Sequence, residues 1–334
     1  MNILLTSYSF WPRIGGLETF AQLLAQELYN QTHSITLLTS VDCDEKNPFP
    51  YQVIRKIDPF TVFYATAHAD VILHNHLSIK LCWASALLNK PYGVIIQNWL
   101  SFKGIKGLLY KWILKKAKIV IGVSKAITDH LPYGGIVIPN AYDHRIFCLP
   151  LAEDRPKDLL FVGRMELDKG AQNLLKAIIL LKQENINLTA TFVGYGPDEN
   201  NLKILQKEYH LENEVSILGP KNAQEVASLM QKHKILVVPS RKEPFGIVAL
   251  EGIACGCVVI GTEEGGLKEA IGPCGLTYPN GDINQLTYKI KELLGNPKKM
   301  YTLKSNAKEH LKKYTSEAIG KLYNDLLSTI LSKE

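Results

Sequence analysis

Short apolar runs alternate with longer amphipathic stretches along the whole chain. In the first half, the apolar runs predict strands at Ile3–Thr6, Ser34–Thr39, Val71–His74, Tyr92–Gln97, Ile119–Val123 and Gly135–Ile138. The stretches between them have helical periodicity and predict helices at Glu18–Tyr29, Ile79–Leu88, Gly107–Lys116 and Lys125–Leu131. Strands and helices in alternation indicate βαβ units and therefore a parallel sheet.

The same rhythm starts again after Pro150, beyond a polar segment at Leu151–Asp158 that we interpret as a linker. Strands are predicted at Leu159–Val162, Asn187–Val193, Val215–Leu218, Ile235–Val238, Val258–Gly261 and Leu276–Tyr278. Helices are predicted at Ala171–Gln183, Glu199–Tyr209, Ala223–Lys232, Ile247–Ala254 and Ile283–Leu294. The expected fold class is α/β, with two doubly wound Rossmann-like domains at 1–150 and 151–314. Ligands of such sheets bind at the carboxyl ends of the strands, so we expect the site in a deep cleft between the domains.

The length of 334 residues suits two domains better than one hydrophobic core. The net charge of +6 is unevenly distributed: residues 1–150 contain 14 Lys or Arg against 9 Asp or Glu, and the remainder contains 24 against 23. This imbalance favours an anionic partner for the first domain, either a membrane surface or an acidic acceptor. No nucleic-acid-binding module is recognisable, so nucleic acid is not an expected partner.

The six cysteines lack the spacing of zinc or thioredoxin-type sites, and Cys255 and Cys257 lie in an apolar run typical of a core. The first residues lack the basic and apolar regions of a signal peptide. No apolar run is long enough to span a membrane. We therefore expect a cytoplasmic protein.

The segment EPFGIVALE carries two carboxylates, Glu243 and Glu251, around the start of a predicted helix near Gly246. The amides at a helix N-terminus, together with the positive end of the helix dipole, favour anions. Carboxylates on either side of such a site can accept hydrogen bonds from the hydroxyls of a sugar and a ribose. Two ordinary surface glutamates at a helix start would show the same spacing.

Two further segments follow the first strand of each domain. In GRMELDKG, Arg164 and Lys169 provide two cations at a strand end, where they can neutralise a diphosphate without a metal. In PRIGGLE, Gly15 and Gly16 allow the backbone to approach a ligand closely, although the dinucleotide fingerprint GxGxxG is absent. A solvated basic loop and a plain turn are the alternatives for these two segments.

The ordered set of motifs resembles glycosyltransferase family four, the retaining enzymes of the GT-B fold also described as glycosyl transferases group 1. The motifs cover nearly the whole chain and read PRIGGLE, VSKAI at 123–127, VIPNAYDHRIF at 137–147, GRMELDKG at 163–170, FVGYGP at 192–197, EPFGIVALE at 243–251 and GGLKE at 265–269. The resemblance implies a hexosyltransferase that uses a nucleotide-diphosphate sugar, with UDP-sugar favoured over GDP-mannose. The C-terminal helix, at about 315–334, is then expected to pack back on the first domain.

The resemblance also implies roles for single residues. Arg164 and Lys169 are expected to bind the donor diphosphate and to act in catalysis together with Glu243, which would contact the transferred sugar. Glu251 is expected to hold the ribose hydroxyls. The other residues implied in donor binding are Gly16, Gly194, Gly196, Lys221, Phe245 and Gly246. The first domain is expected to contribute Ser124 and Asn140 to the wall of the cleft.

Two positions depart from the family pattern. Many members have a histidine at the end of the strand Tyr92–Gln97 that touches the donor sugar or the acceptor, and Gln97 occupies this position here, on the acceptor side of the cleft. The NGVD-like turn reads NAYD, with Ala141 in place of glycine. His74 and His76, in the sequence LHNH, are therefore considered as contacts to the acceptor, although two histidines after a strand are more often ordinary loop residues.

No DxD motif and no evident carboxylate nucleophile are present among the motifs. Retention would then proceed by front-face attack, in which the leaving phosphate accepts the proton of the acceptor. Catalysis would be mostly electrostatic preorganisation, and neither a cofactor nor a metal is expected.

The segment Trp99–Lys118 contains six lysines and no acidic residue, interleaved with aromatic and aliphatic residues. At helical spacing Leu108, Leu109, Trp112 and Ile113 are expected on one apolar face, with Lys111, Lys115 and Lys118 elsewhere. Such a helix suits an anionic bilayer surface and would make the protein peripheral on the inner face of the cell membrane, with a glycan or lipid-linked acceptor. The alternative is that the apolar face packs on the domain's own sheet and the lysines are merely solvated.

Other functions on the same architecture remain open at this point. A nucleotide-sugar epimerase would bind the same donor without an acceptor, and a non-catalytic protein would bind a sugar nucleotide only. An NAD-dependent dehydrogenase is disfavoured by the absence of GxGxxG.

Overall fold

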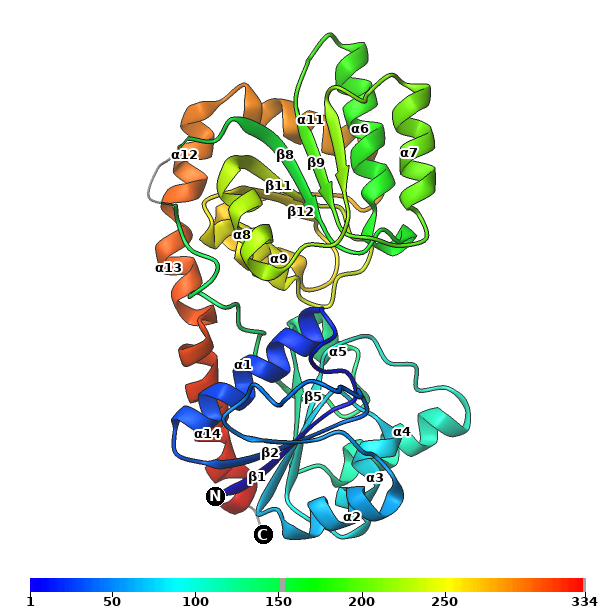
Figure 1. Ribbon diagram of the computed structural model, residues 1–334, viewed down its shortest axis with the longest axis vertical. Coiled ribbons are helices and arrows are strands. Elements are labelled where there is room, and N and C mark those ends of the chain that lie inside the picture. The colour runs from blue at the N-terminus through cyan, green and yellow to red at the C-terminus, as the bar shows by residue number, and fades with distance from the viewer. Residues whose placement is uncertain (151–153, 333–334) are drawn as a thin grey trace. The chain divides into compact units, whose positions relative to one another are not determined.

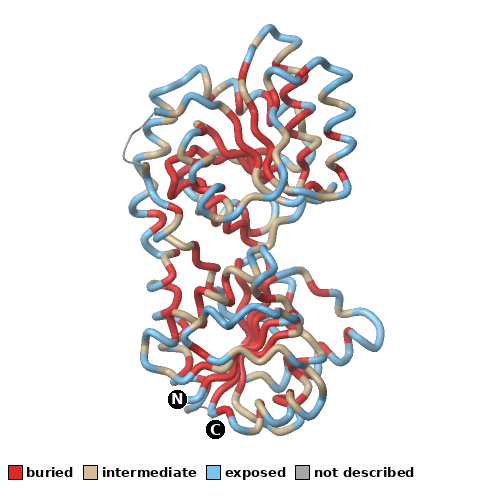
Figure 2. The backbone as a smooth tube through the Cα atoms, in the orientation of Figure 1, coloured by how far each residue is buried: buried red, intermediate tan, exposed pale blue. Residues whose placement is uncertain are grey.

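The computed structural model describes residues 1–150 and 154–332 and consists of two compact units (Figure 1). Unit 1 comprises Met1–Ala141 and the chain from Tyr314 onward, and unit 2 comprises Tyr142–Lys313. Each unit is built around a parallel sheet whose strands are the most deeply buried part of the unit (Figure 2). The predicted α/β class with two parallel sheets is confirmed.

The sheet of unit 1 has seven strands in the order β3-β2-β1-β4-β5-β6-β7. Their bounds are β1 Asn2–Ser7, β2 Ser34–Thr39, β3 Gln52–Ile54, β4 Val71–Asn75, β5 Tyr92–Ile96, β6 Ile119–Gly122 and β7 Ile136–Val137. The central strands β4 and β5 are buried throughout, because helices cover both faces of the sheet. Since the strand order reverses between β1 and β4, the loops after these two strands diverge and leave room for a ligand.

The helices of unit 1 are α1 Gly16–Asn30, α2 Pro59–His68, α3 Ile79–Leu87, α4 Gly104–Lys116, α5 Lys125–Asp129 and α14 Ser316–Ser332. The C-terminal helix α14 packs on α1, where the rings of Phe20 and Tyr323 lie 5.9 Å apart. At the end of this contact His33 Nε2 and Asn324 Oδ1 are 2.8 Å apart. Nearly the whole chain separates these residues in sequence, so the last helix completes the fold of the first unit.

The sheet of unit 2 has six strands in the order β10-β9-β8-β11-β12-β13. Their bounds are β8 Lys157–Val162, β9 Ala190–Val193, β10 Val215–Leu218, β11 His233–Val238, β12 Val258–Thr262 and β13 Gly275–Tyr278. The strand order reverses between β8 and β11. The loops after these two strands carry GRMELDKG and EPFG, so the fold itself places both motifs at the switch point.

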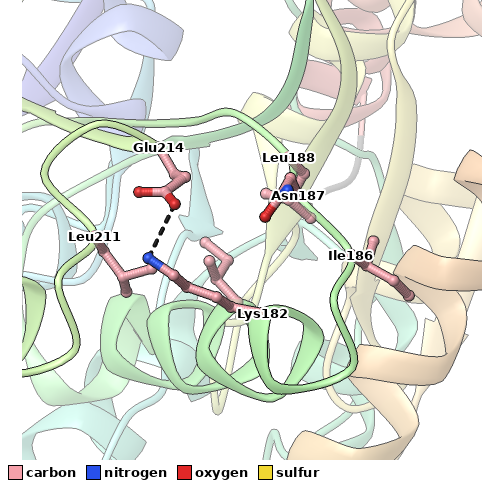
Figure 3. A pocket seen from close by; sticks show the side chains of 7 residues that line it. Lys182, Ile186, Asn187, Leu188, Leu211 and Glu214 are labelled. Atoms are coloured by element: carbon pink, nitrogen blue, oxygen red, sulfur yellow. Dashed lines mark ion pairs between the residues drawn. The ribbon is translucent and has the colours of Figure 1, made fainter.

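The helices of unit 2 are η1 Leu167–Lys169, α6 Ala171–Gln183, α7 Glu199–Glu208, α8 Ala223–Lys232, α9 Ile247–Ala254, α10 Leu267–Ile271, η2 Gly272–Cys274, α11 Ile283–Leu294, α12 Pro297–Ser305 and α13 Ala307–Leu311, followed by η3 Lys312–Tyr314. Away from the switch point, Lys182 at the end of α6 forms an ion pair with Glu214, which precedes β10, at 2.9 Å (Figure 3).

The start of unit 2 is held by Arg155. Its side chain donates to the carbonyls of Met230 and His233 at 3.0 and 2.9 Å, and to that of Cys255.

The predicted strands and helices are all present, with ends shifted by a few residues. The sequence reading missed the strand β3 and the helices α2, α10, α12 and α13. Asp58–Pro59 is nevertheless a recognisable helix start, because Asp58 caps α2 by accepting from Thr61 N at 3.1 Å. Of the predicted linker, Leu151–Glu153 lie outside the described residues, and Lys157–Asp158 already belong to β8. Cys255 and Cys257 are buried, as expected of core residues.

Candidate functional site

The loops after β8 and β11 meet at the switch point of unit 2. Arg241 N donates to the carbonyl of Asp168 at 2.8 Å, which ties the Gly163–Gly170 loop to the Pro239–Gly246 loop. Two loops far apart in sequence thus form one rigid platform at the carboxyl end of the sheet. This platform carries the two cations and one of the two carboxylates that the motifs singled out.

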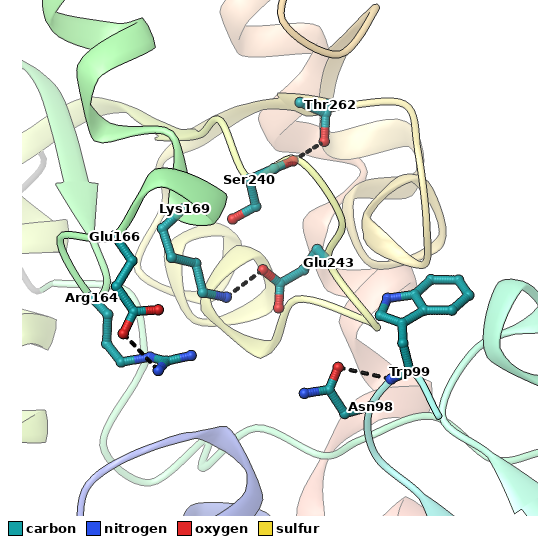
Figure 4. A network of polar contacts seen from close by, with 8 residues as sticks. All are labelled: Asn98, Trp99, Arg164, Glu166, Lys169, Ser240, Glu243 and Thr262. Carbon is teal, nitrogen blue, oxygen red and sulfur yellow. Dashed lines mark hydrogen bonds and ion pairs between the residues drawn. The ribbon is translucent and has the colours of Figure 1, made fainter. Parts of the chain in front are cut away.

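Lys169 and Glu243 form an ion pair across this platform, with Nζ and Oε2 2.7 Å apart (Figure 4). Their side chains are only 28% and 13% exposed, so both are held in place. Arg164 pairs with Glu166 at 2.8 Å, but its side chain is 63% exposed. Lys169 is therefore a fixed positive charge, whereas Arg164 is a charge that can reorient toward an anionic ligand.

The backbone of Glu243 is held by the GGLKE segment. Glu243 forms a parallel bridge with Gly265, and Gly266 N donates to the carbonyl of Glu243 at 2.9 Å. At the end of β12, Thr262 Oγ1 donates to the carbonyl of Ser240, in the loop after β11, at 2.6 Å. The loop that presents Glu243 is thus fixed by β12 and the segment that follows it.

Helix α9 begins at this loop. Gly246, its N-cap, has a φ of +98°, a left-handed conformation that glycine adopts without strain. Phe245 is 1% exposed and anchors the turn in the core. The first amides of a helix generally lack intrahelical acceptors and favour an anion; here Ala249 N already donates to the carbonyl of Gly246 at 2.9 Å. The anion site at Phe245 and Gly246 stays a prediction.

Glu251 lies on α9, where it is half-buried. Burial and the nearby charge of Asp143 raise the pKa of its carboxyl group to about 7. Among the residues that the structure describes, none donates a hydrogen bond to this carboxylate. A ligand that brings hydroxyl donors would therefore be stabilised by Glu251 and would in turn favour its charged form.

The glycines of the FVGYGP segment allow the ends of β8, β9 and β10 to approach each other. Gly194 has a φ of +137°, and a Cβ at this position would lie 1.9 Å from the carbonyl oxygen of Gly163. Gly194 N lies 3.3 Å from the carbonyl of Leu218. Gly196 likewise lies against the backbone of Met165. These two residues shape the loops, and their role in a nucleotide pocket stays a prediction.

Lys221 follows β10, the outermost strand on this side of the sheet, two strands away from β8. Its Nζ pairs with Glu225 at 3.0 Å, where Glu225 and Asn222 form a capping box at the start of α8. Lys221 lines a shallow hollow together with Leu218 and Ser228. The structure thus places Lys221 apart from the platform of Lys169 and Glu243.

In unit 1 the predicted site residues gather at the carboxyl ends of the strands. Gly16 begins α1 directly after the loop that follows β1. Gln97 follows β5 and is 7% exposed; its Nε2 donates to Asn75 Oδ1 at 3.0 Å and its Oε1 accepts from Asn140 Nδ2 at 2.8 Å. Ser124 is buried and caps α5 by accepting from Ile127 N at 3.3 Å. Asn75, which the sequence reading did not single out, lies at the centre of this group.

The two histidines of LHNH have different environments. His74 is buried within β4, and its two ring nitrogens lie 2.7 Å from Thr6 Oγ1 and 3.0 Å from Ser85 Oγ. The hypothesis that His74 contacts an acceptor is therefore wrong, because both of its polar atoms are used inside the unit. His76 lies beyond the end of β4 and is only half-buried, so it keeps its place as a candidate.

Helix α4 is apolar on two opposite sides. Tyr110, Ile113 and Leu114 are buried against the unit. An opposite ridge remains exposed and consists of Ile105, Leu108, Leu109 and Trp112, which are 80%, 65%, 40% and 40% exposed. The expectation that Ile113 shares a face with Leu108 is wrong, because the helix packs through the positions 110, 113 and 114 instead.

The other residues of the proposed membrane segment lie around this ridge or before it. Lys115 and Lys118 are exposed, and Lys111 is half-buried. Trp99 precedes α4 and packs edge-on against His130, with ring centroids 5.5 Å apart. In the described part of the chain, no helix combines the length and apolarity that crossing a bilayer requires.

Comparison with known proteins agrees with this fold. Residues 150–310 match the model of the family glycosyl transferases group 1. An uncharacterized glycosyltransferase of Methanocaldococcus jannaschii is 29% identical to the chain, over 98% of this chain and 99% of the relative.

Solved structures share the fold of the whole chain. Sucrose-phosphate synthase from Thermosynechococcus elongatus has a TM-score of 0.81 and 23% identity, covering 98% of this chain and 99% of that one. HepE of Anabaena, solved in complex with UDP-glucose, has a TM-score of 0.82 and 20% identity, covering 98% and 100%. The two parallel sheets form the GT-B fold of glycosyltransferases. The family match over residues 150–310 and the similarity to a glycosyltransferase over nearly the whole chain identify the protein as a glycosyltransferase.

Proposed function

We propose that this glycosyltransferase moves a hexose from a UDP-sugar to a glycan or lipid-linked acceptor with retention of configuration and without a metal. The observation that carries the proposal is the Lys169–Glu243 pair on the platform beside α9. HepE has the same fold and was solved with UDP and with UDP-glucose. These complexes support a UDP-sugar over a GDP-sugar as the donor. The epimerase alternative is not carried forward, because the family match and the relatives are glycosyltransferases.

The donor would bind to unit 2 through three groups. Lys169 and Arg164 would neutralise the diphosphate, with Arg164 leaving Glu166 for the ligand. The carboxylate of Glu251 would accept hydrogen bonds from the ribose hydroxyls. No described residue donates a hydrogen bond to this carboxylate in their place. Glu243 would accept a hydroxyl of the transferred sugar and keep Lys169 oriented.

Transfer would then proceed on one face of the sugar. The bond between the anomeric carbon and the β-phosphate oxygen breaks while the acceptor oxygen forms its bond to the same carbon from the same side. A β-phosphate oxygen takes the proton of the acceptor hydroxyl. Because Lys169 and the first turn of α9 are already oriented, they stabilise the leaving diphosphate without reorganisation in the transition state.

A panel of UDP-, GDP- and ADP-sugars tests the donor. A bound ligand raises the melting temperature by mass action, so we expect the largest increase with a UDP-sugar. We expect transfer to the acceptor to remain unchanged in excess EDTA. A larger rise in melting temperature with GDP-mannose would make GDP-mannose the proposed donor instead. Strict dependence on added Mn²⁺ or Mg²⁺ would contradict the metal-free mechanism.

We further propose that α4 docks unit 1 on the anionic inner face of the cell membrane. The exposed ridge of Leu108, Trp112 and their neighbours would enter the interface, and Lys111 and Lys115 would contact lipid headgroups. Each lysine near an anionic surface contributes about 1 kcal/mol. The acceptor would then be lipid-linked.

Replacing both Leu108 and Trp112 by serine should lower binding to phosphatidylglycerol vesicles at least about tenfold, because the buried apolar area is lost. Vesicle sedimentation at low and high salt measures this. Tyr301→Ser is the matched control, since Tyr301 is an exposed aromatic residue of unit 2 outside the ridge. If the wild-type protein stays in the supernatant at low salt, α4 is only a surface helix and a soluble acceptor becomes the better proposal.

A further inference from the structure

A chain of buried side chains runs along the carboxyl edge of the unit 1 sheet. Asn75 Nδ2 donates to Ser7 Oγ at 3.1 Å, Gln97 Nε2 donates to Asn75 Oδ1 at 3.0 Å, and Asn140 Nδ2 donates to Gln97 Oε1 at 2.8 Å. All four residues are more than nine-tenths buried. They come from four separate segments of the chain, and we call them the amide relay.

The direction of every hydrogen bond in the amide relay follows from one backbone carbonyl. Asn75 Nδ2 also lies 3.1 Å from the carbonyl oxygen of Leu17. A carbonyl oxygen only accepts, so the atom of Asn75 that faces it must be the NH₂ group. Asn75 Oδ1 then accepts from Gln97, and Gln97 Oε1 accepts from Asn140. If any one of these side-chain amides were rotated by 180°, its oxygen and NH₂ group would change places. Two donors or two acceptors would then face each other.

The relay therefore ends on an acceptor. Asn140 Oδ1 is buried and has no hydrogen-bond partner among the described residues. An unpaired buried carbonyl oxygen is uncommon in folded proteins and calls for a partner. Since Oδ1 can only accept, that partner must bring a donor.

His76, which also contacts Gln97, presents a hydrogen-bond donor where Asn140 presents an acceptor. The backbone N–H of Gln97 donates to His76 Nδ1 at 3.3 Å, so Nδ1 carries no proton and Nε2–H is a donor. Burial and the positive charge of Lys106 lower the pKa of His76 to about 4, which keeps the ring neutral at physiological pH. His76 N donates to the carbonyl of Ile95 at 2.8 Å and fixes the backbone. No described residue accepts from Nε2–H.

We propose that His76 and Asn140 form a sugar-hydroxyl subsite on unit 1, and that Gln97 is the residue that positions both. Gln97 uses its backbone N–H for His76 and its side-chain oxygen for Asn140, so it orients two ligands without touching the sugar itself. A donor and an acceptor of fixed polarity suit hydroxyl groups, which donate and accept. The sugar as ligand rests on the proposed function, whereas the polarity of the subsite does not.

Two substitutions at His76 isolate the outward donor. His76 has a φ of +78°, a conformation that asparagine tolerates well. His76→Asn keeps an oxygen to accept from Gln97 N–H but removes the group at the position of Nε2. His76→Gln places an amide N–H near the position of Nε2. We expect His76→Asn to lower kcat/KM for transfer about tenfold and His76→Gln to restore most of this loss.

Deoxy sugars identify the hydroxyl and the substrate to which it belongs. With the wild-type protein, one monodeoxy analogue of either the donor sugar or the acceptor should lower kcat/KM about tenfold, and His76→Asn should show no further loss with that analogue. An effect with donor analogues assigns the subsite to the transferred sugar, and an effect with acceptor analogues assigns it to the acceptor. Gln97→Leu, which breaks the relay, should abolish the same discrimination while leaving the affinity for UDP unchanged.

Two results would overturn the subsite. One is wild-type kcat/KM in His76→Asn with every sugar tested, and the other is a deoxy penalty that persists in full in both His76→Asn and Gln97→Leu. Melting temperatures of the variants separate these outcomes from misfolding. Failure of the proposed function would differ, because the wild-type protein itself would then show neither a melting shift with UDP nor transfer.

Discussion

Replacing Lys169 by alanine should lower kcat about 10²- to 10³-fold, because the leaving diphosphate loses a fixed countercharge in the transition state. The effect is expected to exceed that of Arg164→Ala, which we expect to be about tenfold. Lys169 is held at 2.7 Å from Glu243 and is largely buried, whereas Arg164 is 63% exposed and already screened by solvent. Steady-state transfer with the preferred UDP-sugar measures both effects.

Lys182→Ala is the matched control for Lys169→Ala. Lys182 is also an ion-paired lysine of unit 2, 2.9 Å from Glu214, but it lies at the end of α6, away from the platform. Its replacement should leave kcat within about twofold of the wild-type value, because this partly exposed pair lies away from the platform and such pairs contribute little to stability. Equal effects of the two substitutions would mean that Lys169 supports the fold of unit 2 rather than the leaving group.

Replacing Glu251 by glutamine should weaken the binding of UDP about 100-fold. Two charge-assisted hydrogen bonds from the ribose hydroxyls would become neutral ones, and hydrogen bonds to charged groups are worth about 1.5–3 kcal/mol each. Titration calorimetry with UDP measures the change. Glu263→Gln is a suitable control, because Glu263 lies on unit 2 just after β12 and has no proposed contact with the ribose. Unchanged affinity in Glu251→Gln would remove Glu251 from the donor site.

Glu251 also predicts how UDP affinity depends on pH. The pKa of its carboxyl group is about 7 without ligand, and ribose hydroxyls that donate to the carboxylate would lower it in the complex. Binding then releases a proton, so affinity should fall as the pH decreases through 7 and should level off above it. In Glu251→Gln this dependence should disappear. A persistent fall of affinity below pH 7 in the variant would assign the titration to another group.

The same pKa has the opposite consequence for stability. Because burial raises the pKa of Glu251 above its ordinary value of 4.5, the folded state binds the proton more tightly than the unfolded state does. The free energy of unfolding should therefore decrease as the pH rises from about 4.5 to 7. Glu251→Gln should melt at a higher temperature than the wild-type protein at pH 8, with the difference vanishing near pH 4.5. Neutralising a carboxylate that the fold desolvates thus stabilises the folded protein at the expense of ligand binding.

The alternation of strands and helices was predictable from the sequence because each strand of a parallel sheet is a short apolar run and each covering helix is amphipathic. Such signals are local, so β1 through β13 could be located with few gaps. The exceptions were weak signals. The short edge strand β3 is only partly buried, and α2 exposes Phe60 and Tyr64, so neither shows the usual periodicity. The helices α10 and α13 have only five residues each, and α12 buries none of its residues.

The motif residues of unit 2 could also be singled out from the sequence, but their pairing could not. Lys169 and Glu243 are separated by 74 positions and meet because the strand order reverses between β8 and β11. Lys221 follows β10, the outermost strand on that side of the sheet, and pairs with Glu225, so its distance from the Lys169–Glu243 pair also depends on the strand order. The distance between two loops depends on the order of strands in the sheet, which no local pattern encodes.

The sequence by itself determined the fold class, the family resemblance and the residues that carry charge at the strand ends of unit 2. Only the tertiary structure distinguished His74 from His76, because the point at which β4 ends decides which ring is enclosed by Thr6 and Ser85. The amide relay likewise required the structure. Its members are the last residues of β1 and β4, the residue after β5, and Asn140, and the polarity of each amide depends on a neighbour that is distant in sequence. Hydrogen-bond direction is a property of the assembled network, whereas apolar periodicity is a property of each segment alone.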